Sequence, residues 1–273
     1  MAELVAVTGA AGKTGRAVVA ALSRRGVRTR ALVHRAEQAQ QGVPGAAESV
    51  AADLGDADAL ATALDGVDAV YLIAPNMHPD EPGLARSVIQ ACAAKGLPRI
   101  VYHSVIHPYV PAMPHHVDKA KVEALLQESA LDWTVLQPAS YFENAYGVWD
   151  SVRDHGRWPL PYSAQAPFTP VALVDVAEVA AGTLTDSRHR FATYELAGPE
   201  VLSTADMAEI AGEVLGREVS VAVDRDPGVA RPERLQAMFD YYDSHGICGN
   251  GTILAALLHR PPTTWRAWVD SHR

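Results

Sequence analysis

The stretch VTGAAGKTGR, from Val7 to Arg16, joins an apolar run to the start of an amphipathic one. Its glycines recur every third residue. Gly9 suits a tight turn, Gly12 lets backbone N–H groups approach a ligand, and Gly15 lets a helix pack closely on the preceding strand. The first turn of that helix adds partial positive charge. The stretch therefore predicts a strand, a glycine turn and a helix that together hold a pyrophosphate.

The chain up to residue 138 repeats this order of elements. Short apolar runs typical of buried strands alternate with amphipathic segments that end at glycines. We predict strands over 4–9, 28–35, 68–75, 99–105 and 132–138, and helices over 15–26, 57–66, 82–96 and 115–130. Alternation of this kind predicts an α/β fold, a Rossmann-type doubly wound parallel sheet with helices on both faces.

The pattern changes after residue 138. Residues 158–170 are rich in proline and aromatic residues and are predicted to form a loop, whereas 173–186 is predicted to be a helix that returns to the first domain. A strand, a helix, a strand and a helix follow, at 192–200, 203–216, 218–224 and 233–247, and Ser203 with Asp206 has the spacing of a capping box.

These elements predict two domains. The first is a dinucleotide-binding domain over 1–140, joined by the return helix around 171–186. The second is a smaller C-terminal α/β substrate lobe built from 141–170 and 187–273.

Composition narrows the class of protein. Apolar residues make up 48% of the 273 residues, and the formal net charge is -9. This balance disfavours a nucleic-acid partner, which needs clustered positive charge, and favours a small-molecule substrate. The N-terminus lacks a basic region ahead of a long apolar run, and no run is long enough to span a bilayer. Cys92 and Cys248 do not form a disulfide framework. We expect a cytoplasmic protein without a membrane partner, and a homodimer is left open.

The loop also carries residues suited to phosphate oxygens. Thr8, Lys13 and Thr14 lie beside the three glycines. A Walker-type phosphate loop does not fit, because the four-residue gap before a Gly-Lys-Ser/Thr triplet is missing. The alternative is a glycine-rich turn that binds nothing. The strand before the motif and the helix after it favour a dinucleotide.

The end of the second strand bears on which dinucleotide is bound. A carboxylate there would accept hydrogen bonds from the ribose of NADH and repel a 2′-phosphate. This strand ends instead in His34 and Arg35, with no acid. Arg35 and Lys13 favour NADPH, and NADH is the less favoured cofactor. Asp53 and Leu54 suit a loop that flanks the adenine, or a simple helix-start turn.

The sequence resembles the NmrA-like group of atypical short-chain dehydrogenases/reductases over nearly its whole length. The resemblance rests on TGAAGKTGR, ALVHR, ADLGD, YLIAP, IVYHS, the His-x-x-x-Lys of 115–119, PASYFEN and the C-terminal stretch from 242 to 269. It implies an extended Rossmann fold with a cleft against the smaller lobe. One departure is that many members have Arg directly after the strand's Val, where this chain has His34 and then Arg35.

The resemblance also implies roles for individual residues. Gly9, Gly12 and Gly15 would hold the pyrophosphate, and Lys119 would reach the nicotinamide ribose. Further cofactor contacts would come from Ala74 of YLIAP and from Pro138, Tyr141 and Phe142 at the nicotinamide end.

The position four residues before Lys119 raises a question about proton transfer. In Tyr-dependent reductases a Tyr stands there, and the lysine lowers its pKa so that it can donate a proton. Here the residue is His115, which either relays a proton or only opens the helix. Ser104 stands where such enzymes keep a serine that polarises a carbonyl. Tyr109 and Tyr141 are alternative acids, or aromatic residues that shape the pocket.

The histidines do not predict a metal site. His103, His107, His115 and His116 lack acidic or cysteine partners at ligand spacing.

Together these features predict an NADPH-dependent oxidoreductase that transfers hydride to a small, aromatic or conjugated substrate such as a quinone, an enone or a ketone. The alternative is a dinucleotide-binding redox sensor that acts through a protein partner without turnover. An isomerase that uses bound cofactor is a third option. Aromatic residues after position 140 favour the enzyme, because they suggest an apolar substrate cleft lined by Tyr141, Phe142, Trp149, Trp158 and Tyr162.

Overall fold

The structure is a computed structural model that describes residues 3–225, 228 and 230–273. The chain divides into two compact units. Unit 1 comprises Met1–Tyr109, His115–Gln137 and Val176–Tyr194, and unit 2 comprises Val110–Pro114, Pro138–Asp175 and Glu195–Arg273. The chain passes between the units several times, and the short segment Val110–Pro114 belongs to unit 2.

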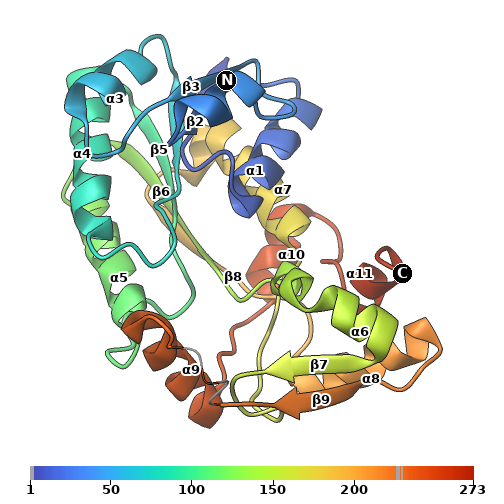
Figure 1. The fold of residues 1–273 in the computed structure, drawn as a ribbon. Coiled ribbons are helices and arrows are strands. Elements are labelled where there is room, and N and C mark those ends of the chain that lie inside the picture. Colours follow the sequence, from blue (N-terminus) through green and yellow to red (C-terminus); the bar gives the residue numbers. More distant parts are fainter. Residues whose placement is uncertain (1–2, 226–227, 229) are drawn as a thin grey trace. The chain divides into compact units, whose positions relative to one another are not determined.

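A seven-stranded sheet forms the centre of the fold in unit 1, with the order β3-β2-β1-β4-β5-β6-β8 (Figure 1). Every recorded pairing among the first six of these strands is parallel. The strands are β1 (Leu4–Val7), β2 (Arg28–Val33), β3 (Glu48–Ala51), β4 (Ala69–Leu72), β5 (Arg99–His103), β6 (Asp132–Pro138) and β8 (Ala192–Leu196). The predicted Rossmann-type sheet is confirmed.

The central strands form because their apolar runs are buried on both faces of the sheet. Every residue of β1, β4 and β5 is buried, as expected for parallel strands covered by helices. The helices of this part are α1 (Lys13–Arg24), α2 (Ala36–Gln41), α3 (Ala57–Ala63), α4 (Glu81–Ala94), α5 (Pro114–Gln127) and α7 (Leu173–Thr185).

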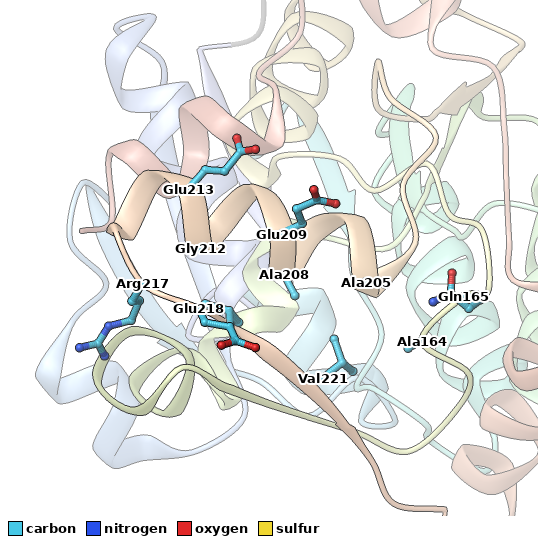
Figure 2. A pocket seen from close by; sticks show the side chains of 11 residues that line it. Ala164, Gln165, Ala205, Ala208, Glu209, Gly212, Glu213, Arg217, Glu218 and Val221 are labelled. Carbon is cyan, nitrogen blue, oxygen red and sulfur yellow. The ribbon is translucent and has the colours of Figure 1, made fainter.

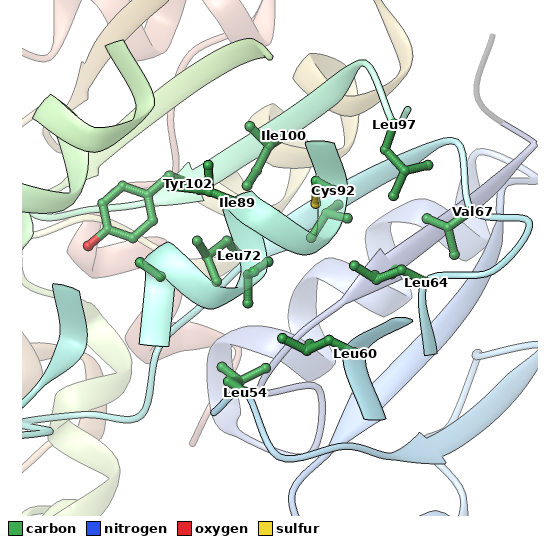
Figure 3. Packing of buried hydrophobic residues seen from close by; sticks show 14 of the residues in the cluster. Leu54, Leu60, Leu64, Val67, Leu72, Ile89, Cys92, Leu97, Ile100 and Tyr102 are labelled. Atoms are coloured by element: carbon green, nitrogen blue, oxygen red, sulfur yellow. The ribbon is translucent and has the colours of Figure 1, made fainter. Parts of the chain in front are cut away.

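The largest part of the unit 1 core is aliphatic (Figure 3). Leu60 of α3 and Leu64, which follows that helix, share this core with Leu72 of β4 and Cys92 of α4. Cys92 is fully buried, and burial raises the pKa of its thiol to about 12. Cys92 therefore acts as a small apolar side chain of the core.

One α-helix and one strand of unit 1 were not predicted from the sequence. They are α2, none of whose residues is buried, and the edge strand β3, whose four residues are all at least partly exposed. An element that buries little surface carries no strong apolar periodicity, and so the pattern does not reveal it.

Unit 2 contains a second, two-stranded parallel sheet of β7 (Arg157–Leu160) and β9 (Ser220–Val223). The prediction of a loop over 158–170 was therefore wrong at its start. Pro159 and Pro161 suggested a loop, but a proline is tolerated in an edge strand, and Trp158 and Leu160 point inward. The helices are α6 (Trp149–His155), α8 (Thr204–Leu215), α9 (Glu233–His245), α10 (Thr252–Leu258) and α11 (Trp265–Asp270). Two 3-10 helices cover Phe142–Gly147 and, in unit 1, Ser187–His189.

The start of α8 is capped as predicted. The Ser203 hydroxyl accepts from the backbone N–H of Asp206 at 3.1 Å, and the Asp206 carboxylate accepts from the backbone N–H of Ser203 at 2.8 Å. This capping box satisfies two backbone donors at the helix start.

The core of unit 2 is aromatic. Four of the chain's five tryptophans, Trp149, Trp158, Trp265 and Trp268, are buried in it with Phe142. The rings of Trp265 and Trp268 stack with centroids 4.8 Å apart, and Trp149 meets Trp268 edge-on at 5.1 Å. Trp149 and Trp158, which the sequence suggested as cleft residues, form this core instead.

A shallow groove of about 460 Å³ runs along α8 and β9 of unit 2 (Figure 2). Ala208 and Val221 line it, with Glu209, Glu213 and Glu218 as its acidic residues. No residue that the sequence predicted for the site belongs to its lining.

No helix in the described part of the chain is both long and apolar enough to cross a bilayer.

Candidate active site

The carboxyl ends of the parallel strands place most of the predicted site residues at one edge of the sheet. The chain leaves β1 for β2 and β3 on one side and returns to β4 on the other side of β1. The strand order therefore reverses between β1 and β4. In open α/β sheets, ligands bind beyond the carboxyl ends of the strands at this switch point.

The glycine loop follows β1 at this switch point. Gly9 has a φ of +58°, a conformation that side chains disfavour. A Cβ on Gly12 would lie 3.2 Å from the Gly9 carbonyl oxygen, and one on Gly15 would lie 2.6 Å from Cα of Ala10. The predicted tight turn and close helix packing are confirmed. These bare backbone positions fit a pyrophosphate at the start of α1, and that binding role stays a prediction.

Thr8, Lys13 and Thr14 flank the glycines. Thr8 is buried, and its hydroxyl donates to the Ile73 carbonyl at 2.8 Å and accepts from the Ile73 N–H at 2.7 Å. It thereby joins the ends of β1 and β4. Lys13 and Thr14 open α1, with Lys13 exposed and Thr14 partly exposed.

The residues predicted around the adenine follow the next strands. His34 and Arg35 come after β2, and both are exposed. The backbone N–H of Arg35 donates to the side-chain oxygen of Gln38 at the start of α2. Since no carboxylate stands at the end of β2, this edge offers a cation rather than an acid to a ribose.

Asp53 and Leu54 form the turn that leads into α3. The Asp53 carboxylate accepts from the Gly55 N–H at 2.8 Å, while Leu54 is buried in the core. The structural alternative, a helix-start turn, is thus confirmed, and contact with adenine stays a prediction. Ala74, predicted to touch the cofactor, follows β4 and is buried.

Lys119 lies on α5 and is held by a carboxylate from α4. Its Nζ is 2.8 Å from Oε1 of Glu81 and 3.4 Å from the His103 carbonyl oxygen. The Tyr102 hydroxyl donates to the same Glu81 oxygen at 2.7 Å. Burial and then Glu81 hold the pKa of Tyr102 well above its usual value. The ammonium and the carboxylate therefore form a largely buried ion pair beside the end of β5.

Ser104 follows β5 and is bonded to a second buried carboxylate. Its hydroxyl donates to Oε1 of Glu123 at 2.5 Å, and Nε2 of Gln137 donates to both Glu123 oxygens, at 2.9 and 3.0 Å. Tyr109 donates to Oε2 of the same carboxylate at 3.3 Å. Glu123 is 1% exposed and Ser104 is 2% exposed, whereas Tyr109 is 68% exposed. These hydrogen bonds thus connect Ser104, at the buried end of β5, with the exposed Tyr109.

Buried imidazoles lie beside these groups. His103 is fully desolvated, and burial followed by the charge of Lys119 lowers its pKa to about 3; its Nδ1 meets the Tyr71 hydroxyl at 2.6 Å. Burial also lowers the pKa of His116 to about 4. His115, the residue in question, is buried at the second position of α5 and packs edge-on against His116, with centroids 4.4 Å apart.

The remaining predicted residues lie in unit 2. Pro138 ends β6, and Tyr141 forms a β-bridge with Val171. Phe142 is 1% exposed and packs against Trp265 with centroids 5.2 Å apart. The predicted roles of these residues at the nicotinamide stay predictions.

Sequence reasoning missed Glu81, Glu123 and Gln137. A signal for Glu123 was present, because His115, Lys119 and Glu123 recur every four residues and so share one face of a helix. Glu81 lies far from Lys119 in the sequence, in the first turn of α4, and no local pattern connects them.

No group of three or more histidine, cysteine or acidic side chains suited to a metal ion occurs in residues 3–225, 228 and 230–273.

Comparisons with known proteins agree with this geometry. The model of a family described as NAD(P)H-binding matches residues 9–187. An NAD(P)H azoreductase of Xenophilus azovorans is 28% identical over 282 residues, which cover 98% of each chain. A (4-alkanoyl-5-oxo-2,5-dihydrofuran-3-yl)methyl phosphate reductase of Streptomyces griseus is 29% identical, again over 98% of each chain. The solved NADPH complex of an Escherichia coli NADPH-dependent quinone oxidoreductase is 25% identical with a TM-score of 0.84, covering 98% of this chain and 99% of that one.

Proposed function

We propose that this member of the NAD(P)H-binding family uses NADPH to reduce a small conjugated acceptor. The chain belongs to the NmrA-like group of atypical short-chain dehydrogenases/reductases and is an NAD(P)H-dependent oxidoreductase. The observation that carries the proposal is the glycine turn at the β1–β4 switch point, with Ser104 and Lys119 beyond the neighbouring β5. When bound, the cofactor supplies the hydride.

Different residues of unit 1 bind different parts of the cofactor. The glycine turn and the start of α1 receive the pyrophosphate, and Arg35 faces the adenosine ribose with its phosphate. Lys119 uses two of its three N–H bonds on Glu81 and on the His103 carbonyl among the described residues. The third is available for a ribose hydroxyl.

The substrate class follows from what these groups can do. Both nearby imidazoles with strongly lowered pKa values, His103 and His116, are neutral at pH 7 and are weak sources of a proton. Acceptors that delocalise the incoming charge need the least help from a protein acid. The names of the three relatives specify an azo compound, an unsaturated furanone and a quinone, which are electron-poor conjugated groups. A quinone or an enone is therefore our proposed acceptor.

The test is consumption of NADPH and of NADH against quinones, enones and aromatic ketones, with cofactor binding followed by fluorescence. We expect turnover of at least one quinone or enone, and loss of cofactor binding or turnover in Lys119→Ala. Tight NADPH binding without turnover of any acceptor would contradict the proposal and favour the redox sensor.

Cofactor preference is tested separately with Arg35→Ala. We expect kcat/KM for NADPH to fall about tenfold, which corresponds to about 1.4 kcal/mol, while the value for NADH stays the same. Arg24→Ala, an exposed arginine at the end of α1, is the control. An equal fall for both cofactors would assign Arg35 to folding or to general binding rather than to the 2′-phosphate.

A further inference from the structure

We propose that Glu123 is a positioning residue for Ser104 that also renews its proton, in a path that runs from Tyr109 through Glu123 to Ser104. The proposal rests on the proposed function, in which an oxygen of the acceptor lies against Ser104 at the end of β5.

The path is continuous in the structure. The Tyr109 hydroxyl is 3.3 Å from Oε2 of Glu123, and Oε1 of the same carboxylate is 2.5 Å from the Ser104 hydroxyl. The two carboxylate oxygens therefore face the two ends of the path. Gln137 donates to both oxygens and fixes the plane of the carboxylate between them.

Burial makes an internal path necessary. Glu123 is 1% exposed, so solvent does not return a proton to its carboxylate directly. Tyr109 is 68% exposed and its hydroxyl still reaches the buried carboxylate. Tyr109 is thus the point at which solvent protons enter the cluster.

The charges around Glu123 suit a group that gains and loses a proton. Its hydrogen bonds within the described part of the chain come from a serine, an amide and a phenol, which are all neutral. The nearby ammonium of Lys119 is paired with Glu81 instead. A proton can therefore enter or leave Glu123 without breaking an ion pair.

The proton balance is as follows. The oxyanion of the reduced acceptor takes the proton of the Ser104 hydroxyl, so that a new O–H bond forms on the product. Ser104 takes a proton from Oε1 of protonated Glu123, which becomes a carboxylate held by Gln137, Ser104 and Tyr109. Glu123 then regains a proton at Oε2 from the Tyr109 hydroxyl, which is reprotonated by water. A half-turn of the carboxyl group, which keeps its plane and its bonds with Gln137, exchanges the two oxygens and returns the proton to the side of Ser104. One solvent proton is consumed per turnover.

The test is a double-mutant cycle with a quinone as acceptor. We expect Glu123→Gln to lower kcat about 100-fold, the lower end of what a positioned proton donor contributes, while the Kd for NADPH stays unchanged. Ser104→Ala should cost a similar factor, and the double variant should lose no more than either single variant. Glu128→Gln, an exposed residue just beyond α5, is the matched control and should behave as wild type.

A cationic acceptor separates proton supply from structural damage. A triphenylmethyl cation gains hydride without forming an oxyanion and needs no proton. We expect Glu123→Gln to reduce it at the wild-type rate. Equal losses with the cation and the quinone, or additive losses in the cycle, would overturn the path. If the wild-type protein reduces neither acceptor, it is the proposed function that fails.

The free protein offers a readout that does not depend on turnover. The carboxyl ¹³C NMR signal of Glu123 is identified by its loss in Glu123→Gln. We expect it to shift in Ser104→Ala and in Tyr109→Phe, because both hydroxyls bond this carboxylate. A signal that stays in place in both variants would overturn the path.

Discussion

Two buried carboxylates, Glu81 on α4 and Glu123 on α5, are held in opposite ways. Glu81 faces the ammonium of Lys119 and a tyrosine hydroxyl, whereas Glu123 faces only neutral donors among the described residues. In a buried ion pair each charge stabilises the other, because removing one of them leaves an unpaired charge in the interior. A carboxylate among neutral donors belongs to no ion pair, so replacing it leaves no buried cation without its partner. The difference suggests that one carboxylate positions a lysine and the other handles protons.

The largest expected effect comes from breaking the ion pair. Lys119→Met leaves Glu81 as an uncompensated charge that is 5% exposed, and we expect the free energy of unfolding to fall by about 3–5 kcal/mol. Urea denaturation at pH 7 measures it. Lys95→Met removes the exposed pair with Asp65 and should leave the free energy of unfolding nearly unchanged. Equal losses in the two variants would show that the Glu81 pair is not fixed in the way described.

The buried imidazoles extend the comparison to pH. The folded-state pKa of His103 is about 3 and that of His116 about 4, below the ordinary value of 6.5. Below pH 6.5 the unfolded chain therefore binds protons that the folded protein does not bind. The free energy of unfolding falls as the pH is lowered from 6.5, until the pKa of the folded state is reached. Between pH 6.5 and 5 each histidine should cost about 2 kcal/mol.

His116→Gln is the variant that checks this pH dependence. It should remove one histidine's share of the slope of unfolding free energy against pH between 6.5 and 5. An unchanged slope would mean that the pKa of His116 is the same in the folded and the unfolded protein.

Two tyrosines test how each carboxylate uses its hydroxyl donor. Tyr102→Phe removes a buried hydrogen bond to charged Glu81 and should cost about 1.5–3 kcal/mol. Tyr109→Phe removes a longer bond from an exposed residue and should change stability by less than about 0.5 kcal/mol. Thermal and urea unfolding measure both. A large loss in Tyr109→Phe would make that residue structural rather than an entry point for protons.

Glu123→Gln is also expected to change stability little. The amide keeps an acceptor for Ser104, and no cation is left unpaired, so the free energy of unfolding should fall by no more than about 1 kcal/mol. Urea unfolding at pH 7 checks this. A fall as large as that in Lys119→Met would remove the contrast between the two carboxylates.

Much of unit 1 was predictable because its signals are local. The glycine spacing gave the turn at Gly9 and the close packing at Gly15, and the buried apolar runs gave the central strands. Weakly buried elements such as α2 and β3 carry no such signal. The strand at Arg157–Leu160 was missed because its partner, β9, lies more than sixty residues later in the chain.

The candidate site was predicted only in part for a similar reason. Ser104, His115 and Lys119 belong to motifs that are read along the chain. The Glu81–Lys119 pair joins residues 38 positions apart, and the Ser104–Glu123 bond joins residues from a strand end and a helix. Contacts of this kind depend on how elements pack, and a single sequence does not specify them.

The aromatic core of unit 2 has a spectroscopic consequence. Four of the five indoles are packed together there, and only Trp133 belongs to unit 1, where it meets Phe191 edge-on. Intrinsic fluorescence therefore reports mainly on unit 2, and the stacked Trp265 and Trp268 should give an exciton couplet in circular dichroism. The tryptophan signals therefore follow the unfolding of unit 2, whereas the backbone ellipticity follows the unfolding of both units.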